Sequence, residues 1–222
     1  MTIGPDIKEA IVEVGTKYTI VRDGGNITGE YLDYETNAQV TKPFIREFFL
    51  EATLVYDTQI VSGDIIQFST TLSKYFIMNI TPEMFENTVI SYQAVLYKTN
   101  ETITVYRPSE QRDSKTYQIK TVWTPVQTAK PILITSPLFG IDLETDQNLG
   151  LIGLQLHEAY VPSNYGIKVL DRLLLSSGEY FRVEAIKKRR FEGIDVLDVG
   201  TDTRATTTTT TSTTTSTTTT TA

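Results

Sequence analysis

Short runs of strand-forming residues, separated by turn residues, recur along this chain and constrain its fold more than any other feature. Lys17–Arg22 and Ile27–Tyr34 flank the turn Asp23–Asn26, whose two glycines permit positive φ, so this segment predicts a β-hairpin. Further strands are expected at Ile60–Phe68, Tyr75–Ile80, Val89–Lys98, Thr102–Arg107, Thr116–Trp123, Lys168–Leu175, Tyr180–Ile186 and Gly193–Val199. Many short strands joined by turns are typical of β-barrels and sandwiches.

The composition agrees with a packed β fold. Hydrophobic residues make up 40% of the 222 residues and charged residues 21%, which is apolar enough for a core. Twelve Tyr and nine Phe suit a pleated, half-buried surface. The sequence therefore predicts a mainly β protein of small barrel or sandwich type, as one domain or two in tandem. A short N-terminal helix precedes this region, and an extended Thr-rich C-terminal tail follows it.

An internal similarity bears on the number of domains. Asp64 and Asp171 each precede a strand-type run, a turn and then a Tyr-Phe pair, and a later Phe follows in both. If this similarity is a duplication, it implies two related small β domains. A hairpin is also expected around the polar turn at residues 99–101. We place a helix and barrel-like domain at 1–112, a second β region at 113–204 with an irregular excursion at 138–166, and the tail at 205–222.

Two segments carry helix signals. Ile7, Ala10, Ile11 and Val14 fall on one face of a helix, and Gly15 suits its end. A helix this short has little stability alone, so Ile7, Ile11 and Val14 are predicted to dock on another surface. The run Thr81-Pro82-Glu83 has a capping residue before a proline, and it predicts a second short helix reaching Phe85. Residues 44–61 fit strand and helix equally.

The C-terminal segment from Ala205 is almost entirely threonine and cannot form a core. It is either a solvated appendage or an extended arm that lies on a neighbouring subunit, since Thr favours extended backbone. In the second case, Thr206, Thr213 and Thr221 are candidate contact residues.

The sequence gives little support to catalysis. Without Cys, there is no disulfide, no thiol nucleophile and no Cys-based zinc site. His157 is the one histidine, and the nucleophile-elbow, metalloprotease and phosphate-loop motifs are missing. We therefore predict no enzyme activity, no catalytic residue, no cofactor and no metal site. Neither a signal peptide nor a membrane span is recognisable, so we expect synthesis in a cytosol and no membrane partner.

Charge narrows the partners further. The net charge of −7 disfavours binding to nucleic acid through phosphates, although an acidic surface could line a passage along which DNA slides. The run Lys187, Lys188, Arg189 and Arg190 suits an acidic partner or a DNA backbone, or it is a solvated hairpin turn. Trp123 is either an interface anchor or a cap on its own core.

Two stretches resemble a known class of virion proteins. SGDIIQFSTTLSKYFIMNITPEMFENTVISYQAVLYKTN and VLDRLLLSSGEYFRVEAIKKRRFEGIDVLDV share an order of strand, turn, aromatic strand and return strand. This order is similar to the small β-barrels of head-completion, head-closure and head-tail connector proteins in the neck of tailed bacteriophages. The resemblance covers roughly residues 15–107 and 167–204. This chain is longer than the simplest stopper proteins of that family and adds the Thr-rich tail.

The resemblance implies a ring in the virion neck that joins the portal-bearing head to the tail and helps to retain DNA. Its implied partners are copies of this chain, portal or adaptor proteins and tail proteins, with assembly in the host cytoplasm. A tail tube, tail terminator or baseplate subunit is the alternative within this class. A ligand-binding β-sandwich module with a Thr-rich linker is the alternative of another class.

Overall fold

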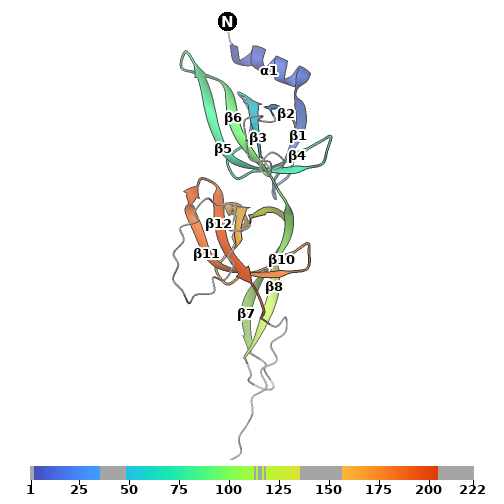
Figure 1. Ribbon diagram of the computed structural model, residues 1–222, viewed down its shortest axis with the longest axis vertical. Helices are drawn as coiled ribbons and strands as arrows, with labels where there is room; N and C mark the ends of the chain where they lie inside the picture. The colour runs from blue at the N-terminus through green and yellow to red at the C-terminus, as the bar shows by residue number, and fades with distance from the viewer. Residues whose placement is uncertain are drawn as a thin grey trace, which may run out of the picture.

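A computed structural model describes residues 3–35, 49–112, 114, 117, 119–135 and 157–204. One helix leads into a succession of strands (Figure 1). The elements are α1 (Ile3–Val14), β1 (Thr16–Val21), β2 (Ile27–Glu35), β3 (Phe49–Val55), β4 (Ile65–Phe68), β5 (Lys74–Phe85), β6 (Thr88–Lys98), β7 (Glu101–Arg112), β8 (Ile119–Thr135), β9 (His157–Pro162), η2 (Ser163–Tyr165), β10 (Arg172–Leu175), β11 (Tyr180–Phe191) and β12 (Ile194–Thr201).

The strands close into two barrels of six strands each. The first has the order β1-β2-β3-β6-β5-β4, and the second has the order β10-β11-β12-β9-β8-β7. Within each closed barrel, both edges of the sheet are paired, which lowers the risk that an edge strand pairs with another chain. The expectation of a mainly β fold is confirmed, and within it the structure selects two barrels in tandem over a sandwich.

Both barrels follow one strand plan. Started from β7, the second barrel runs β7-β8-β9-β12-β11-β10, which matches the first barrel strand for strand. The hydrogen bonds repeat as well: Ile77 N donates to Asp64 O over 2.9 Å, and Val183 N donates to Asp171 O over 3.0 Å. The strand register shifts directly after Ile77 and directly after Val183. The similarity around Asp64 and Asp171 thus lies on equivalent strands of a repeated barrel.

Each barrel has its own apolar core. The inward side chains of the first barrel are almost fully buried, and burying one such side chain contributes about 1.5–3 kcal/mol. These residues are Tyr18, Ile20, Leu32, Leu50, Ala52, Leu54, Ile60, Ile66, Phe68, Ile77, Ala94 and Leu96. The second core consists of Ile103, Val105, Ile132, Ala159, Val161, Tyr165, Ile167, Leu173, Leu175, Phe181, Val183, Leu197 and Val199.

Helix α1 covers one end of the first barrel, as the helix signal predicts. It packs against β2, β3 and β6, and Ile11 is buried in that contact. The helix ends at Gly15, whose N–H donates to Ile11 O over 2.8 Å. The predicted docking surface is therefore the chain's own barrel. Val14 is 76% exposed and takes little part in it.

The predicted helix at Thr81–Phe85 is wrong, because strand β5 continues to Phe85. Pro82 lies opposite Tyr92 in the β5–β6 hairpin. The hairpin turns at Glu86 and Asn87, which have φ of 47° and 62°. Positive φ at both central residues gives the turn a twist that matches a β-hairpin. Pairing with β6 therefore overrides the local helix-capping signal.

The domain boundary at residue 112 is also misplaced. Strands β6 and β7 do not form the expected hairpin, since β7 pairs with β8 and β10 and closes the second barrel. The barrels divide at the short connection after Lys98. Part of the expected excursion at 138–166 is regular, because residues 157–162 form β9 and 163–165 form η2. Its remainder at 138–156 lies outside the described residues, as does the tail at 205–222.

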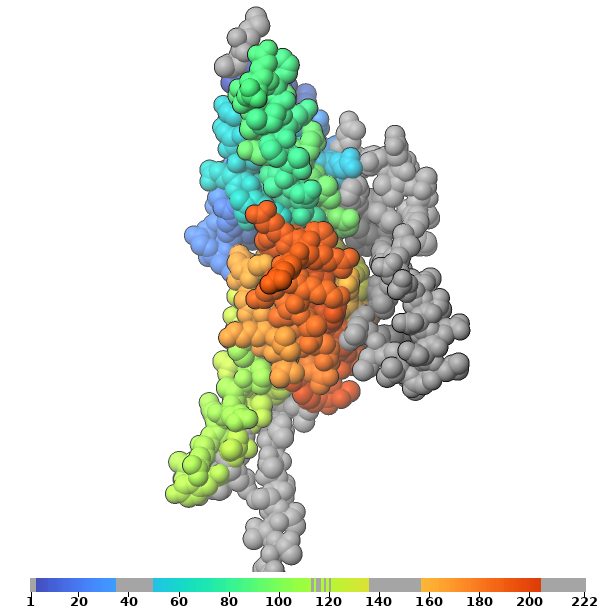
Figure 2. All heavy atoms as spheres, turned by 90° about the vertical axis from the view of Figure 1, so that its left-hand side faces the viewer, coloured from blue at the N-terminus to red at the C-terminus, as the bar shows by residue number. Residues whose placement is uncertain are grey.

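The outer half of the β7–β8 hairpin projects from the second barrel. Pro108–Arg112 pairs with Ile119–Trp123, and we call these two segments the β7–β8 arm. Figure 2 shows it as the yellow-green projection below the orange barrel. At the equivalent place, the first barrel has the short turn between β1 and β2. A two-stranded ribbon is only marginally stable by itself, so an arm of this kind is suited to contact with a partner.

Candidate interaction surfaces

The two barrels meet at a packed joint. Ile65, Phe76 and Met78 from the first barrel form one buried cluster with Ile194 from the second, and Phe191 packs against it. The joint also contains a polar bond, in which Ser62 Oγ donates to Glu192 O over 2.8 Å. The tip of the β11–β12 hairpin thus rests on the loop before β4, and the two barrels are held as one body.

Two glycines permit the closest approach in this joint. A Cβ added to Gly63 would lie 2.2 Å from the Gly193 carbonyl oxygen, and a Cβ added to Gly193 would lie 2.2 Å from Ser62 O. Both glycines also have positive φ, at +89° and +69°. The joint therefore requires glycine on both sides, for space and for backbone conformation.

A small cleft of about 120 Å³ opens beside the joint, lined in part by Arg22, Asp64 and Lys130. Of its charged lining residues, Arg22, Asp64, Lys130 and Asp23 form ion pairs, and Lys74 lines it as well. Arg22 Nε donates to Asp64 Oδ1 over 2.9 Å, and Lys130 Nζ pairs with Asp23. Pockets for small organic ligands usually enclose ~300–1,000 Å³. Because it is small and most of its charged side chains are paired, we interpret this cleft as a gap at the edge of the joint and not as a ligand site.

An arginine–aspartate pair recurs in both barrels. Arg22 directly follows β1 and Arg107 lies within β7, and they donate to Asp64 and Asp171, respectively, through Nε and Nη2. Both aspartates also accept a loop N–H, and both arginines donate to a loop carbonyl. Asp171 is almost fully buried, with a side chain 2% exposed. These pairs fix the loop before β4 and before β10, so their role is structural.

Trp123 lies at the end of the second barrel that faces away from the first. Two guanidinium groups lie over its ring, with Arg172 Cζ 4.2 Å and Arg204 Cζ 4.7 Å from the ring centroid. Asp202 links the two arginines, accepting bonds of 2.7 Å from Arg172 Nε and from Arg204 Nη2. Trp123 therefore caps its own barrel, in line with the second of the two sequence interpretations.

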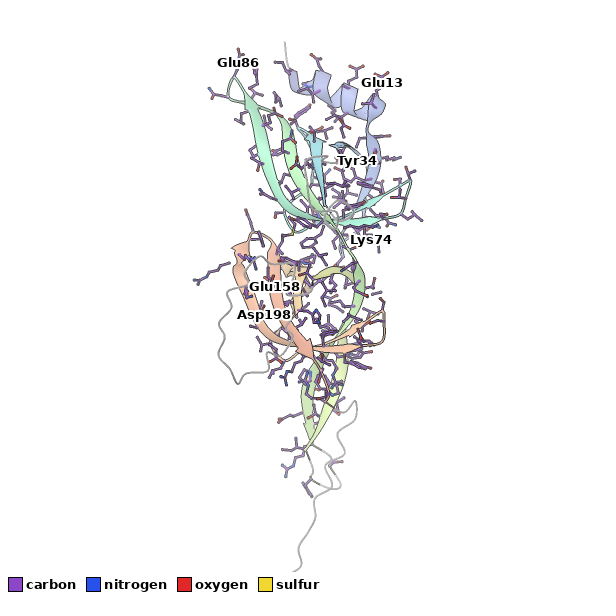
Figure 3. All side chains as sticks on the ribbon, viewed as in Figure 1. Glu13, Tyr34, Lys74, Glu86, Glu158 and Asp198 are labelled. Atoms are coloured by element: carbon purple, nitrogen blue, oxygen red, sulfur yellow. The ribbon has the colours of Figure 1, made fainter. Side chains whose placement is uncertain are left out.

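The basic run does not form a turn, because residues 187–190 belong to strand β11. Lys187 Nζ donates to Glu158 over 3.1 Å and to Asp198 over 2.7 Å, and Arg190 also bonds Glu158. Glu158 and Asp198 are labelled in Figure 3. Lys188 and Arg189 are exposed. The run thus divides into two residues that form ion pairs within the barrel and two that face solvent.

Glu158 and Tyr160 titrate away from their ordinary values in this network. Partial burial works to raise the pKa of Glu158, but hydrogen bonds from Lys187 and Tyr160 outweigh it and hold the pKa below its usual range. Burial, with the neighbouring Glu158 carboxylate, raises the pKa of Tyr160 to about 12. Glu158 is therefore ionised at neutral pH and holds β9 to β11.

The structure brings few of the predicted site residues together. Ile7, Ile11 and Val14 lie on α1, on the first barrel, whereas Trp123 and the basic run lie on the second. Thr206, Thr213 and Thr221 lie outside the described residues. His157 is half-buried and meets the Phe181 ring edge-on at 5.3 Å. In the described ranges, we find no group of three metal-ligating side chains and no helix long and apolar enough to cross a membrane.

Sequence reasoning missed two exposed apolar patches. Met84 and Phe85 at the tip of β5–β6 are 54% and 47% exposed. Val169 and Leu170, in the loop before β10, are 50% and 52% exposed. The signal was available for the first patch, since Phe85-Glu86-Asn87 parallels Phe191-Glu192-Gly193. It was obscured because the first of these segments was assigned to a helix.

Comparison with known proteins does not add a family. No family model matches this chain, and no curated protein matches it. Among solved structures, a chain of the K. pneumonia MrkH–c-di-GMP complex aligns over 90% of this chain and 86% of that chain. The identity is 10% and the TM-score 0.15, a level of similarity that carries no argument about fold or function.

Proposed function

We propose that this chain is a structural subunit of a tailed-phage neck, where it forms a ring between the head or portal and the tail and helps to retain DNA. The observation that carries the proposal is the repeated barrel with projecting hairpins. Two barrels are joined as one body, and β5–β6 projects at one end while the β7–β8 arm projects at the other (Figure 1). A rigid scaffold with projecting elements at both ends suits a subunit that must hold neighbours on two sides.

The exposed side chains support a role in contact with proteins. Met84 and Phe85 are half-exposed at one tip, and Tyr117 and Ile119 are 69% and 58% exposed at the arm. Large apolar side chains gathered at projecting tips are typical of interaction sites. In contrast, the cleft at the joint is small and most of its charged side chains are ion-paired. These observations favour an assembly role over a ligand-binding module.

The net charge suits a subunit that DNA passes without being held. At −7, the chain has no overall attraction for phosphates, and its basic run is half committed to Glu158 and Asp198. Binding to nucleic acid through phosphates requires uncommitted Lys and Arg side chains. We therefore propose passage of DNA beside this protein with no sequence-specific binding.

The test is to disrupt the gene in the phage that encodes it and to examine the lysate by electron microscopy. A neck subunit predicts separate heads and tails, with normal particles restored when the gene is supplied in trans. Immunogold labelling of complete particles should place the protein between head and tail. Labelling along the tail or at its tip would assign it to the tail tube, terminator or baseplate. Normal particles without the protein would reject a structural role.

A further inference from the structure

The joint between the barrels provides a template for contact between molecules. Within one chain, the hairpin tip at Phe191–Gly193 rests on the loop before β4. Because the barrels share one strand plan, each half of this joint has a counterpart elsewhere in the chain. The counterpart of the tip is Phe85–Asn87, and the counterpart of the loop is the segment before β10.

Both counterparts are exposed. The tip carries Met84 and Phe85, each about half exposed, and Figure 3 shows Glu86 at its outermost point, remote from the second barrel. The loop carries Val169 and Leu170, again about half exposed. We propose that the Glu83–Asn87 tip of one copy docks on the Lys168–Asp171 loop of a second copy, repeating between molecules the contact that joins the barrels within one.

One substitution between the repeats defines the kind of contact. Gly63 has φ +89°, and Leu170 occupies the equivalent position with φ +72°. Both N–H groups donate over 2.9 Å to the following aromatic strand, Gly63 to Ile77 O and Leu170 to Val183 O. A side chain at this position blocks the backbone approach that Gly63 permits. The contact between copies therefore uses side chains, with Leu170 and Val169 against Phe85 and Met84.

Leu170 is held in an unfavourable conformation. A non-glycine residue in the left-handed region costs about 1–2 kcal/mol, and a half-exposed leucine recovers little of this through burial in its own barrel. A second copy that covers Leu170 would supply the missing burial.

The charges of the two surfaces are complementary. The tip carries exposed Glu83 and Glu86. Near the loop, Arg107, Arg172 and Arg204 share two carboxylates, those of Asp171 and Asp202, and Lys168 adds another positive charge. An acidic tip with two apolar side chains thus faces a basic loop with two apolar side chains. Complementary charge of this kind steers association and fixes register.

Such a contact joins different surfaces of the two copies, so it propagates from one copy to the next. It gives a closed ring when the rotation between copies closes and an open filament when it does not. The inference rests on the proposed function only in that both require copies of this chain to meet. It is tested on purified protein, so its failure leaves the result of the gene disruption unaffected.

The absence of Cys from the sequence permits a clean crosslinking test. Glu86→Cys and Lys168→Cys, which leave the apolar side chains of the tip and the loop in place, are prepared as separate full-length variants, mixed and oxidised, with one variant isotopically labelled to identify mixed dimers by mass. Contact raises the local concentration of the two thiols, so the mixed disulfide should form about tenfold faster or more than in the control. The control pairs Glu86→Cys with Ser177→Cys, an exposed turn residue of the same barrel. Equal rates for the two pairs would overturn the proposal.

A second measurement uses a substitution that should not destabilise the fold. Leu170→Gly removes the docking side chain and also relieves the backbone strain. Leu72→Gly is its match, because Leu72 is 67% exposed with φ 57° in the first barrel. With the thiols at Glu86 and Lys168, crosslinking should fall at least about tenfold with Leu170→Gly and stay unchanged with Leu72→Gly. A similar rate for both would count against the contact.

Discussion

Gly63 of the first barrel and Gly193 of the second lie backbone to backbone, so close that a Cβ on Gly63 would lie 2.2 Å from the Gly193 carbonyl oxygen. Real Cβ contacts are not that short, so any side chain here forces the barrels apart. The same displacement would strain the cluster of Phe76, Met78 and Ile194 around the joint.

Gly63→Ala should therefore destabilise the protein by about 3 kcal/mol, from unfavourable φ and from the disrupted joint. Gly178→Ala is the matched control, because Gly178 has nearly the same φ, +88°, with no atom within 4 Å of an added Cβ. That variant should lose only about 1 kcal/mol. Urea denaturation followed by circular dichroism measures both free energies of unfolding. Equal losses would show that the joint does not depend on close backbone approach.

Asp64 and Asp171 hold equivalent loops, and their substitution should have equivalent effects. Asp64→Ala or Asp171→Ala leaves a partly buried guanidinium and a loop N–H without their partner, which should cost about 3 kcal/mol in each case. Since the two sites lie in different barrels, the losses should add in the double variant. Chemical denaturation of the three variants is the measurement. A negligible effect in one barrel would contradict the structural equivalence of the two pairs.

The repeated barrel shows how far the sequence could predict this fold. The β1–β2 hairpin and α1 were predicted correctly, because the turn Asp23–Asn26 and the stop at Gly15 are local signals. Barrel closure pairs β1 with β4 and β7 with β10, strands distant in sequence whose pairing no local signal encodes. The same non-local pairing placed β7 in the second barrel, whereas the segment around Pro82 is a strand because it pairs with β6 in a hairpin.

For the candidate surfaces, the sequence predicted which residues are involved but not which partners they contact in space. The basic run was recognised, but its partner Glu158 lies 29 positions before Lys187, in a segment expected to be irregular. Trp123 was recognised as well, yet its contacts with Arg172 and Arg204 depend on three separate segments meeting at the end of the barrel. The patch at Leu170 follows only from knowing which faces the barrels leave uncovered, whereas the patch at Phe85 had a sequence signal in its parallel with Phe191.

Acid should weaken the cap around Trp123. The Asp202 side chain is 1% exposed, and burial alone would raise its pKa, but hydrogen bonds from Arg204 and Arg172 outweigh burial and hold the pKa far below its ordinary value. Since the folded pKa is depressed, the unfolded chain takes up the proton first as the pH falls. The stabilisation is complete above the ordinary pKa of about 3.9 and is lost as the pH falls further.

Asp202→Asn tests this linkage. At neutral pH, the variant should be less stable than the natural protein by about 2 kcal/mol, and the difference should shrink in acid as the natural carboxylate becomes protonated. Urea denaturation across the acid range gives the difference, and Trp123, the one tryptophan of the chain, reports the transition by fluorescence. A difference that stays constant with pH would show that the lost stability does not come from the charge of Asp202.

The basic run allows a comparison of two double substitutions that each remove two positive charges. Lys187 and Arg190 of β11 pair with Glu158 of β9, on the far side of β12, whereas Lys188 and Arg189 face solvent. Replacing the first two with Gln should cost about 1 kcal/mol, a modest loss because both side chains are nearly half exposed. Replacing Lys188 and Arg189 with Gln should change stability by less than about 0.5 kcal/mol.

The same two variants decide whether the run binds a partner. If Lys188 and Arg189 meet an acidic surface in the assembled particle, their replacement should weaken incorporation into particles while leaving the isolated protein as stable as before. Incorporation is measured by complementing the gene disruption with each variant, and stability by thermal unfolding. A defect confined to the Lys187 and Arg190 variant would mean that the run serves the barrel alone, because only the internal ion pairs to β9 and β12 would then matter.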